Sequence, residues 1–178
     1  MAKLRKMLGK ADSPYIVSLM HSIETQSKET IAKWCLDYAE EVILPIFEKY
    51  CPNDPRPQMA LSASRDWFEG KKKLPEVKRI ILNECHAAAR ELDHEPAAQA
   101  AARACGQAAA CFHTPTHSLG LAFYGTAAIA YDRVGLQESS EVYDKIAAEE
   151  CAKMEQALRK ISVDCEPNPA KINWHCKD

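Results

Sequence analysis

Three histidines have the residue type and spacing for metal chemistry. His113 and His117 lie one helical turn apart, which would let two imidazoles share a zinc ion or another transition metal. Zinc needs at least one more ligand, and His86 on a neighbouring predicted helix is the attractive candidate. No conventional ligand spacing is complete, however. The alternative interpretation is that His113 closes one helix, His117 lies in the first turn of the next, and both make local hydrogen bonds.

Patterns for other catalytic chemistry are incomplete. Glu91-x-x-His94 is half of the carboxylate–histidine pattern of di-iron helical bundles, and the chain holds no second copy. Cys85 and His86 are adjacent, so on a helix their side chains point about 100° apart and are poorly placed to act together. The sequence contains no Gly-x-Ser-x-Gly motif and no Gly-rich phosphate loop. It therefore indicates no catalytic residue and no cofactor, and it favours a protein that is not an enzyme.

Two predicted helices carry residues that are typical of protein interfaces. Arg65 and Trp67 lie together on one helix, and Trp34 lies on an earlier one. Arginine and tryptophan are enriched among the residues that dominate the binding energy of interfaces. We expect these three residues to anchor a protein partner if they are exposed. Tryptophan is also common in cores, so a structural role for Trp67 is the alternative.

The stretch from Pro96 to Tyr131 must position these residues. After Arg103 it contains no Asp, Glu, Lys or Arg. A charge-free stretch of this length is either embedded in a membrane or surrounded on all sides by other elements. Thr114-Pro115 divides the stretch into two helical segments, because threonine is a good N-cap and proline suits the first helical position.

Small residues recur at helical spacing in both halves of this stretch. They are Ala98, Ala102, Gly106 and Ala110 before the break, then Gly120, Gly125, Ala127, Ala128 and Ala130 after it. Without bulky side chains on that face, two helix backbones can approach closely. Neither half supplies the roughly 20 strongly apolar residues that a membrane-spanning helix needs. We therefore predict a central, closely packed helical hairpin and no membrane partner.

Amphipathic periodicity predicts the other helices. Their expected starts are Ser13-Pro14, Ser27, Pro57, Leu74-Pro75 and Ser139 or Ser140, after a short, loosely held helix over residues 1–11. Pro45 interrupts the second pattern, so we expect a kink near Glu41 to Val42 or a break there. Alternation of β-branched residues is absent. The prediction is an all-α, single-domain bundle of six or seven helices over residues 1–178, with an irregular tail over 164–178.

Composition narrows the possible partners and the compartment. A net charge of −2 and a pI near 6.3 lack the basic surplus of a general nucleic-acid or anionic-membrane binder. The N-terminus shows no uninterrupted apolar segment of a secretory signal, so we expect a cytoplasmic protein. The eight cysteines include no C-x-x-C, and we expect them to be thiols.

The chain from Arg56 to Arg133 resembles a family of Ala-rich, all-helical bacterial immunity proteins of polymorphic-toxin systems. The residues that carry the resemblance are Arg56-Pro57, Ala60-Leu61, Arg65-x-Trp67-x-x-Gly70, Ala100-Ala101-Ala102-Arg103-Ala104-x-Gly106-x-Ala108, His113-x-x-x-His117-x-Leu119-Gly120 and Ala122-x-Tyr124-Gly125. This resemblance implies a protein that binds and neutralises a toxin made by the same or a related cell. It supplies neither the identity of the toxin nor any binding residue.

Two functional hypotheses follow. The first is a cytoplasmic, non-enzymatic immunity protein that binds a cognate toxin through Arg65, Trp67 and Trp34, with no nucleic-acid partner. The alternative is a helical protein that binds a metal or small molecule at a site lined by His86, His113 and His117. A homodimer is compatible with either hypothesis.

Overall fold

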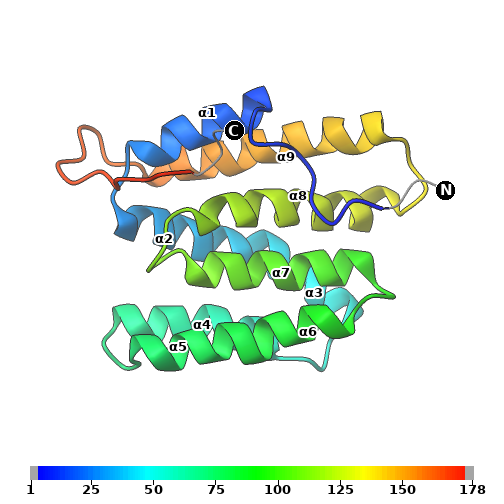
Figure 1. The fold of residues 1–178 in the computed structure, drawn as a ribbon, viewed down its shortest axis with the longest axis horizontal. Helices are drawn as coiled ribbons and strands as arrows, with labels where there is room; N and C mark the ends of the chain where they lie inside the picture. Colours follow the sequence, from blue (N-terminus) through cyan, green and yellow to red (C-terminus); the bar gives the residue numbers. More distant parts are fainter. Residues whose placement is uncertain (1–3, 175–178) are drawn as a thin grey trace.

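A computed structural model describes residues 4–174, and over these residues the fold is all-α with no strand (Figure 1). The helices are α1 (Pro14–Glu24), α2 (Lys28–Tyr38), α3 (Leu44–Tyr50), α4 (Arg56–Phe68), α5 (Leu74–Ile80), α6 (His86–Glu91), α7 (Pro96–Ala110), α8 (His117–Val134) and α9 (Ser140–Ile161). The π-helical segments η1 (Ala39–Ile43) and η2 (Ile81–Cys85) join α2 to α3 and α5 to α6. Residues 4–174 therefore form seven continuous helices, which confirms the predicted all-α bundle.

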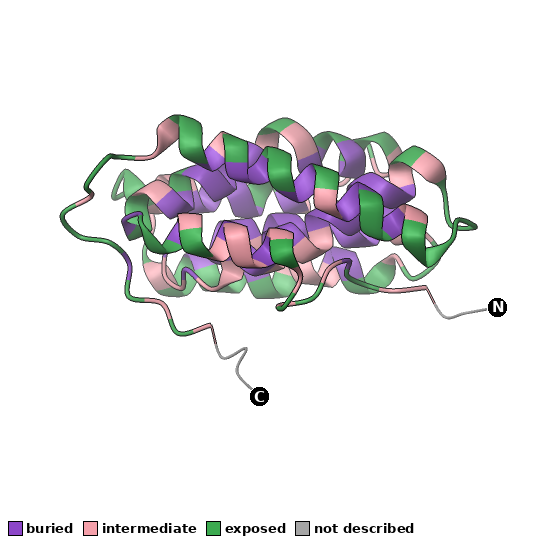
Figure 2. Cartoon of the chain, turned by 90° about the horizontal axis from the view of Figure 1, so that it is seen from above, coloured by how far each residue is buried: buried purple, intermediate pink, exposed green. Residues whose placement is uncertain are grey.

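The helices pack in successive layers around α7 and α8. In Figure 1, α1 and α9 lie together on one side, and α4 lies with α5 and α6 on the other. Between them, α7 contacts α8, α4, α3, α6 and α2. Figure 2 shows that buried positions face the interior and exposed positions cover the outer faces. None of the helices described is long and apolar enough to cross a membrane.

The predicted hairpin is the centre of this core. Twelve of the fifteen α7 residues are buried, which is possible on nearly every face because most of them are alanine. The turn between the two helices is longer than predicted. Residue Thr114 does not cap α8, which begins at His117, and Pro115 lies in the turn, where its carbonyl accepts a 2.6 Å hydrogen bond from Ser118 Oγ.

Pro45 does not break its helix. The chain stays helical through η1 and continues as α3 with Pro45 in the first turn. Proline has no N–H to donate to the preceding turn, and the wider π-helical turn just before it accommodates that missing bond. The second π-helical segment, η2, contains no proline, and nothing in the sequence predicted it.

Most predicted helix boundaries are confirmed. Ser27 caps α2 because its side chain accepts a hydrogen bond from the Thr30 backbone N–H. Ser139 caps α9 in the same way, with the Val142 N–H as donor. Gly70 and Gly135 follow α4 and α8 with φ of +71° and +75°, the left-handed conformation that glycine adopts without a Cβ clash.

The N-terminal helix prediction is wrong for the described residues 4–11. They form an irregular strap because tertiary bonds fix them: Leu8 N–H donates to the Phe123 carbonyl at 3.1 Å, and Tyr131 Oη donates to the Arg5 carbonyl. The Leu8 side chain of this strap is buried.

The C-terminal tail is also a strap over its described part. Gln26 holds it at two points, because its side-chain oxygen accepts from Val163 N–H and its carbonyl accepts from Ala170 N–H, both at 2.8 Å. The described cysteines are free thiols. Cys176 and the end of the predicted tail lie outside the described residues.

Two carboxylates of α9 are buried and ion-paired. Glu150 contacts Arg133 at 2.6 Å and Lys153 at 2.7 Å, and Glu155 accepts from Ser18, Ser22 and Arg159. Burial alone would raise the pKa of each carboxyl, but these hydrogen bonds and positive charges lower both pKa values below 4.5. The Glu150–Arg133 ion pair ties α9 to α8, and the hydrogen bonds of Glu155 with Ser18 and Ser22 tie α9 to α1.

These carboxylates predict a pH dependence of stability. Because their pKa values are depressed in the folded state, their stabilisation is present above the unfolded value and is lost as pH falls through the folded value. The double variant Glu150→Gln/Glu155→Gln should be less stable than the parent protein at pH 7, and this difference should shrink as the pH falls through the depressed pKa values of the two carboxyls. Urea unfolding at several pH values measures it. A gap that stays constant with pH would contradict the prediction.

The close approach of α7 to α6 predicts a strict limit at Gly106. A Cβ added there would lie 2.6 Å from His86 Cε1. Gly106→Ala should therefore lower the free energy of unfolding by about 1–2 kcal/mol, although alanine favours a helix by about 1 kcal/mol. Combining it with His86→Ala should remove the clash, so that the double variant is more stable than the sum of the single changes predicts. If the two losses of unfolding free energy measured with urea are simply additive, the His86 ring moves aside without cost in Gly106→Ala.

Candidate functional site

The histidines predicted to bind a metal are locally hydrogen-bonded. His113 Nδ1 lies 2.7 Å from Thr114 Oγ1, and His117 Nδ1 lies 2.7 Å from Gln107 Oε1. The His113 and His117 rings are 5.7 Å apart and nearly perpendicular. His86 packs against Gly106 of α7. The bond of His113 is the local hydrogen bonding of the alternative interpretation, whereas His117 bonds across the hairpin to α7.

A metal site does not follow from this geometry. Within residues 4–174, no group of three or more His, Cys, Asp or Glu side chains could hold a metal ion. Over residues 4–174 this finding gives no support to the alternative hypothesis that His86, His113 and His117 share one metal.

Burial makes all three histidines poor proton acceptors. It lowers the pKa of His113 to about 4, with further lowering by Lys78 and His117. Burial also lowers the pKa of His117, and it lowers the pKa of His86 together with the charges of Arg103 and Arg90. Burial therefore favours the neutral imidazole at all three positions.

The structure brings together Trp67 and His113, which the sequence suggested for two separate sites. Trp67 at the end of α4 packs on Phe112 of the α7–α8 turn with ring centroids 4.5 Å apart, and Phe112 packs on His113 at 4.9 Å. Phe68 contacts Trp67 edge-on at 5.0 Å. A continuous row of rings thus runs from α4 to His117, and we call it the aromatic row. The row fixes the end of α4 against the central hairpin.

Arg65 is held rigidly beside this row. Its guanidinium makes a two-point contact with Glu40, at 2.9 and 2.6 Å, and a 2.8 Å bond with Asp37. The Glu40 hydrogen bonds and those of Asp37 raise the pKa of Arg65. Two-point arginine–carboxylate pairs restrict orientation as well as charge. Arg65 therefore presents a fixed cation at a side-chain exposure of 37%.

Trp34 cannot serve as the surface anchor that we expected. It is 1% exposed, and its Nε1 donates to the Met154 carbonyl at 3.0 Å. Its place on the apolar stripe of α2, facing α9, is what buries it. Trp67 is partly buried against the core. Arg65 and Trp67 as partner contacts remain predictions.

The exposed aromatic in this region is Phe68, which the sequence analysis did not single out. It is 41% exposed and lines a groove of about 320 Å³ between the outer faces of α2 and α4. The groove is lined by Glu29, Lys33, Leu36, Arg65, Phe68 and Glu69, and we call it the Phe68 groove. Two apolar side chains, Leu36 and Phe68, thus lie among charges of both signs, a combination found at protein-binding surfaces.

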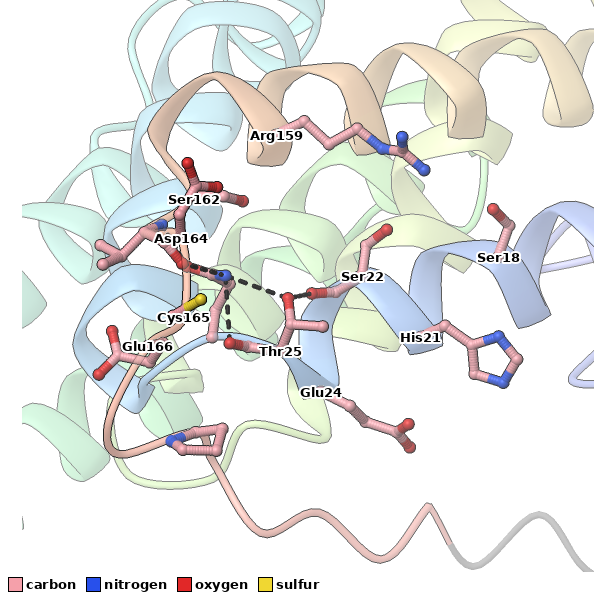
Figure 3. Close-up of a pocket in the computed structure, with 13 residues that line it drawn as sticks. Ser18, His21, Ser22, Glu24, Thr25, Arg159, Ser162, Asp164, Cys165 and Glu166 are labelled. Atoms are coloured by element: carbon pink, nitrogen blue, oxygen red, sulfur yellow. Dashed lines mark hydrogen bonds between the residues drawn. The ribbon is translucent and has the colours of Figure 1, made fainter.

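A larger cleft of about 860 Å³ lies between the ends of α1 and α9 and the C-terminal strap (Figure 3). Arg159 extends from α9 above Ser18 and Ser22, while His21 and Glu24 project from α1. The central polar groups already bond to one another, since Glu155 accepts from Ser18, Ser22 and Arg159. Internal hydrogen bonds therefore fix the shape of the cleft. The irregular tail forms one of its walls, and nothing in the sequence of that tail predicted a cleft.

Comparison with known proteins identifies one family. The model of the family described as "Imm-5 like putative immunity protein" matches residues 21–157, which is more than half of the chain. The matched range includes the Phe68 groove and the aromatic row. No curated protein and no solved structure matches the chain.

The aromatic row and the Phe68 groove predict different costs for neighbouring substitutions. Trp67→Ala should lower the free energy of unfolding by about 3 kcal/mol, because it removes a ring packed on Phe112 and the core. Phe68→Ser should cost less than about 1 kcal/mol because much of that side chain is already in water. Urea unfolding followed by circular dichroism compares the two. Equal costs would mean that Phe68 is part of the core rather than a free surface.

Proposed function

The chain belongs to the Imm-5 like immunity protein family, and from this premise we propose that it is a non-enzymatic protein that binds and neutralises a protein toxin. We propose further that the Phe68 groove is the contact surface. The toxin would be inhibited because its functional surface is covered, and no chemical change in either protein is needed.

The observation that carries this proposal is the exposed Phe68 beside a groove on a rigid support. Large aromatic side chains with a surrounding polar rim dominate the binding energy of protein interfaces. Phe68 is supported from behind by Trp67, which is itself packed on Phe112. A preformed support of this kind reduces the conformational entropy lost on binding.

The size and charge of the Phe68 groove define the complementary surface on the toxin. A volume of about 320 Å³ accommodates one or two apolar side chains of a partner. Lys33 and Arg65 are already paired with Asp37, and Glu69 is paired with Lys71, so a partner would meet these charges as existing ion pairs at the edge of the groove. Pairing charges of both signs selects one partner and one orientation more than it increases affinity.

The chemistry of the histidines and buried cysteines elsewhere also supports binding rather than catalysis. The nearby imidazoles make local hydrogen bonds, and burial lowers the pKa of His113 to about 4. The Cys85 and Cys151 thiols are buried, and burial raises the pKa of each to about 12. A thiol with so high a pKa is a poor nucleophile at neutral pH.

The test is capture followed by growth rescue. Tagged protein should retain a stoichiometric partner from the lysate of its own organism. That partner, expressed alone in a host cell, should arrest growth, and co-expression of this chain should restore growth. A partner without toxicity, or toxicity that this chain does not relieve, would contradict the immunity function.

The contact surface has its own matched test. Phe68→Ser should weaken binding of the purified toxin at least about tenfold, because an interface aromatic often contributes 2 kcal/mol or more. Leu136→Ser is the control: Leu136 is 40% exposed, as Phe68 is, but it lies in the α8–α9 turn at the other end of the bundle (Figure 1). Calorimetry measures both affinities. Equal affinities for the two variants would exclude the Phe68 groove while leaving toxin binding intact.

A further inference from the structure

Arg103 is an unusual cation in this fold. It is the only Asp, Glu, Lys or Arg between Pro96 and Tyr131, and it projects from the helix at the centre of the core. Its Nε has no exposed surface and no hydrogen-bond partner among the described residues. None of the ion pairs within residues 4–174 includes its guanidinium. A buried donor left without a partner costs free energy, so its presence calls for an explanation.

Arg103 lines a cavity of about 250 Å³, far more than the roughly 10–15 Å³ that one water needs. The walls come from the N-terminal strap, the start of α7 and the end of α8. They are formed by Leu4, Arg5, Lys6, Asp93, Pro96, Gln99, Ala100, Arg103 and Tyr131. The cavity therefore has room for a small polar ligand beside the guanidinium.

The charges around this cavity favour an anion. Three cations line it, and Asp93 is the one carboxylate in the lining. Asp93 is already engaged, because it accepts a 2.8 Å hydrogen bond from Gln99. Arg5 is paired with Asp144 at 2.8 Å, which leaves Arg103 and Lys6 as the cations without a carboxylate partner among residues 4–174.

The N-terminal strap closes one side of the cavity. Leu8 N–H bonds to the Phe123 carbonyl at 3.1 Å, and Tyr131 Oη bonds to the Arg5 carbonyl, so both ends of the strap are fixed to α8. The Arg103 guanidinium carbon lies 5.8 Å from the Tyr124 ring centroid, within the range of a cation–π contact. A wall fixed in this way suits a small free anion better than the side chain of a docked protein.

We propose that this cavity is a binding site for a small oxyanion, with a phosphate or carboxylate group bound by the Arg103 guanidinium and the Lys6 ammonium. A guanidinium offers donors in a planar fork that matches both groups. The strap would be the element that the anion stabilises, because Lys6 and Arg5 belong to it. This site lies apart from the Phe68 groove and does not depend on toxin binding.

Thermal unfolding and calorimetry with inorganic phosphate, acetate and chloride at equal ionic strength test the site. Phosphate or acetate at about 100 times its Kd should raise the Tm by roughly 5–10 °C relative to chloride. A response to phosphate alone identifies a phosphate site, and a response to acetate alone identifies a carboxylate site. If neither anion changes the Tm or gives binding heat, the proposal is wrong.

Three variants assign the effect to Arg103. Arg103→Met should abolish the anion-dependent rise in Tm, and Arg103→Lys, which keeps the charge but loses Nε and the planar fork, should weaken anion binding at least about fivefold. Arg79→Met removes one exposed cation outside the cavity and should leave the response unchanged. If the anions raise the Tm equally in all variants, the effect is general anion screening and the proposed site is wrong.

A further readout separates a ligand-binding arginine from a structural one. In chloride alone, Arg103→Met should unfold at the same temperature as the parent protein or higher, since it removes an uncompensated cation. A fall in Tm of several degrees in chloride would mean that Arg103 stabilises the fold without a ligand. Lys6→Met, on the exposed part of the strap, gives an independent check if Arg103→Met does not fold, and it should also weaken anion binding.

Discussion

The rest of the structure depends on the close packing of α7 against α8. Both helices are rich in alanine and glycine, so their backbones approach without bulky side chains between them. Because alanine can be buried on any face of a helix, α7 contacts helices on several sides at once. Bulk in the core then comes from the surrounding helices, as with Trp34 and Phe47, which are fully buried. A close-packed interior tolerates little added volume, and the contact of Gly106 with His86 illustrates that limit.

The same hairpin supports the groove that we propose as the docking surface. Its turn carries Phe112 to the end of α4, and Phe112 packs there on Trp67. This contact uses Trp67 as a support and leaves its neighbour Phe68 exposed beside the groove. Arg65, fixed by Glu40 and Asp37, supplies a cation at the rim. A surface that is already ordered before binding is well suited to an inhibitor that must act by covering another protein.

Charge placement in the core follows one rule with one exception. The buried carboxylates Glu150 and Glu155 are each paired with a cation and hydrogen-bonded, as burial of charge requires. Arg103 departs from this rule, because its Nε is buried without a partner. Polar groups that reduce stability in this way are commonly kept for function. The N-terminal strap over Arg103 was not predicted as a strap, since its order comes from bonds to Phe123 and Tyr131.

The sequence by itself determined the helices and the hairpin. Helical periodicity, the serines at positions 27 and 139, and the glycines at positions 70 and 135 are local signals, and each acts within one or two turns of its own position. The lack of charge after Arg103 also sufficed to place the hairpin in the core. The family resemblance came from the sequence too, and the match over residues 21–157 confirms it.

Only the tertiary structure decided which side chains are available for function. Helical periodicity predicts on which face of a helix a residue lies, but not what packs against that face. Trp34 and Trp67 therefore looked equivalent in the sequence, although α9 buries Trp34. The contact of Trp67 with Phe112 joins residues far apart in the chain, and no local signal reports such a distance. The histidines illustrate the same point, because the Gln107 that bonds to His117 and the Gly106 beside His86 lie on another helix. Long-range packing therefore determined the candidate sites, whereas local chemistry determined the helices that carry them.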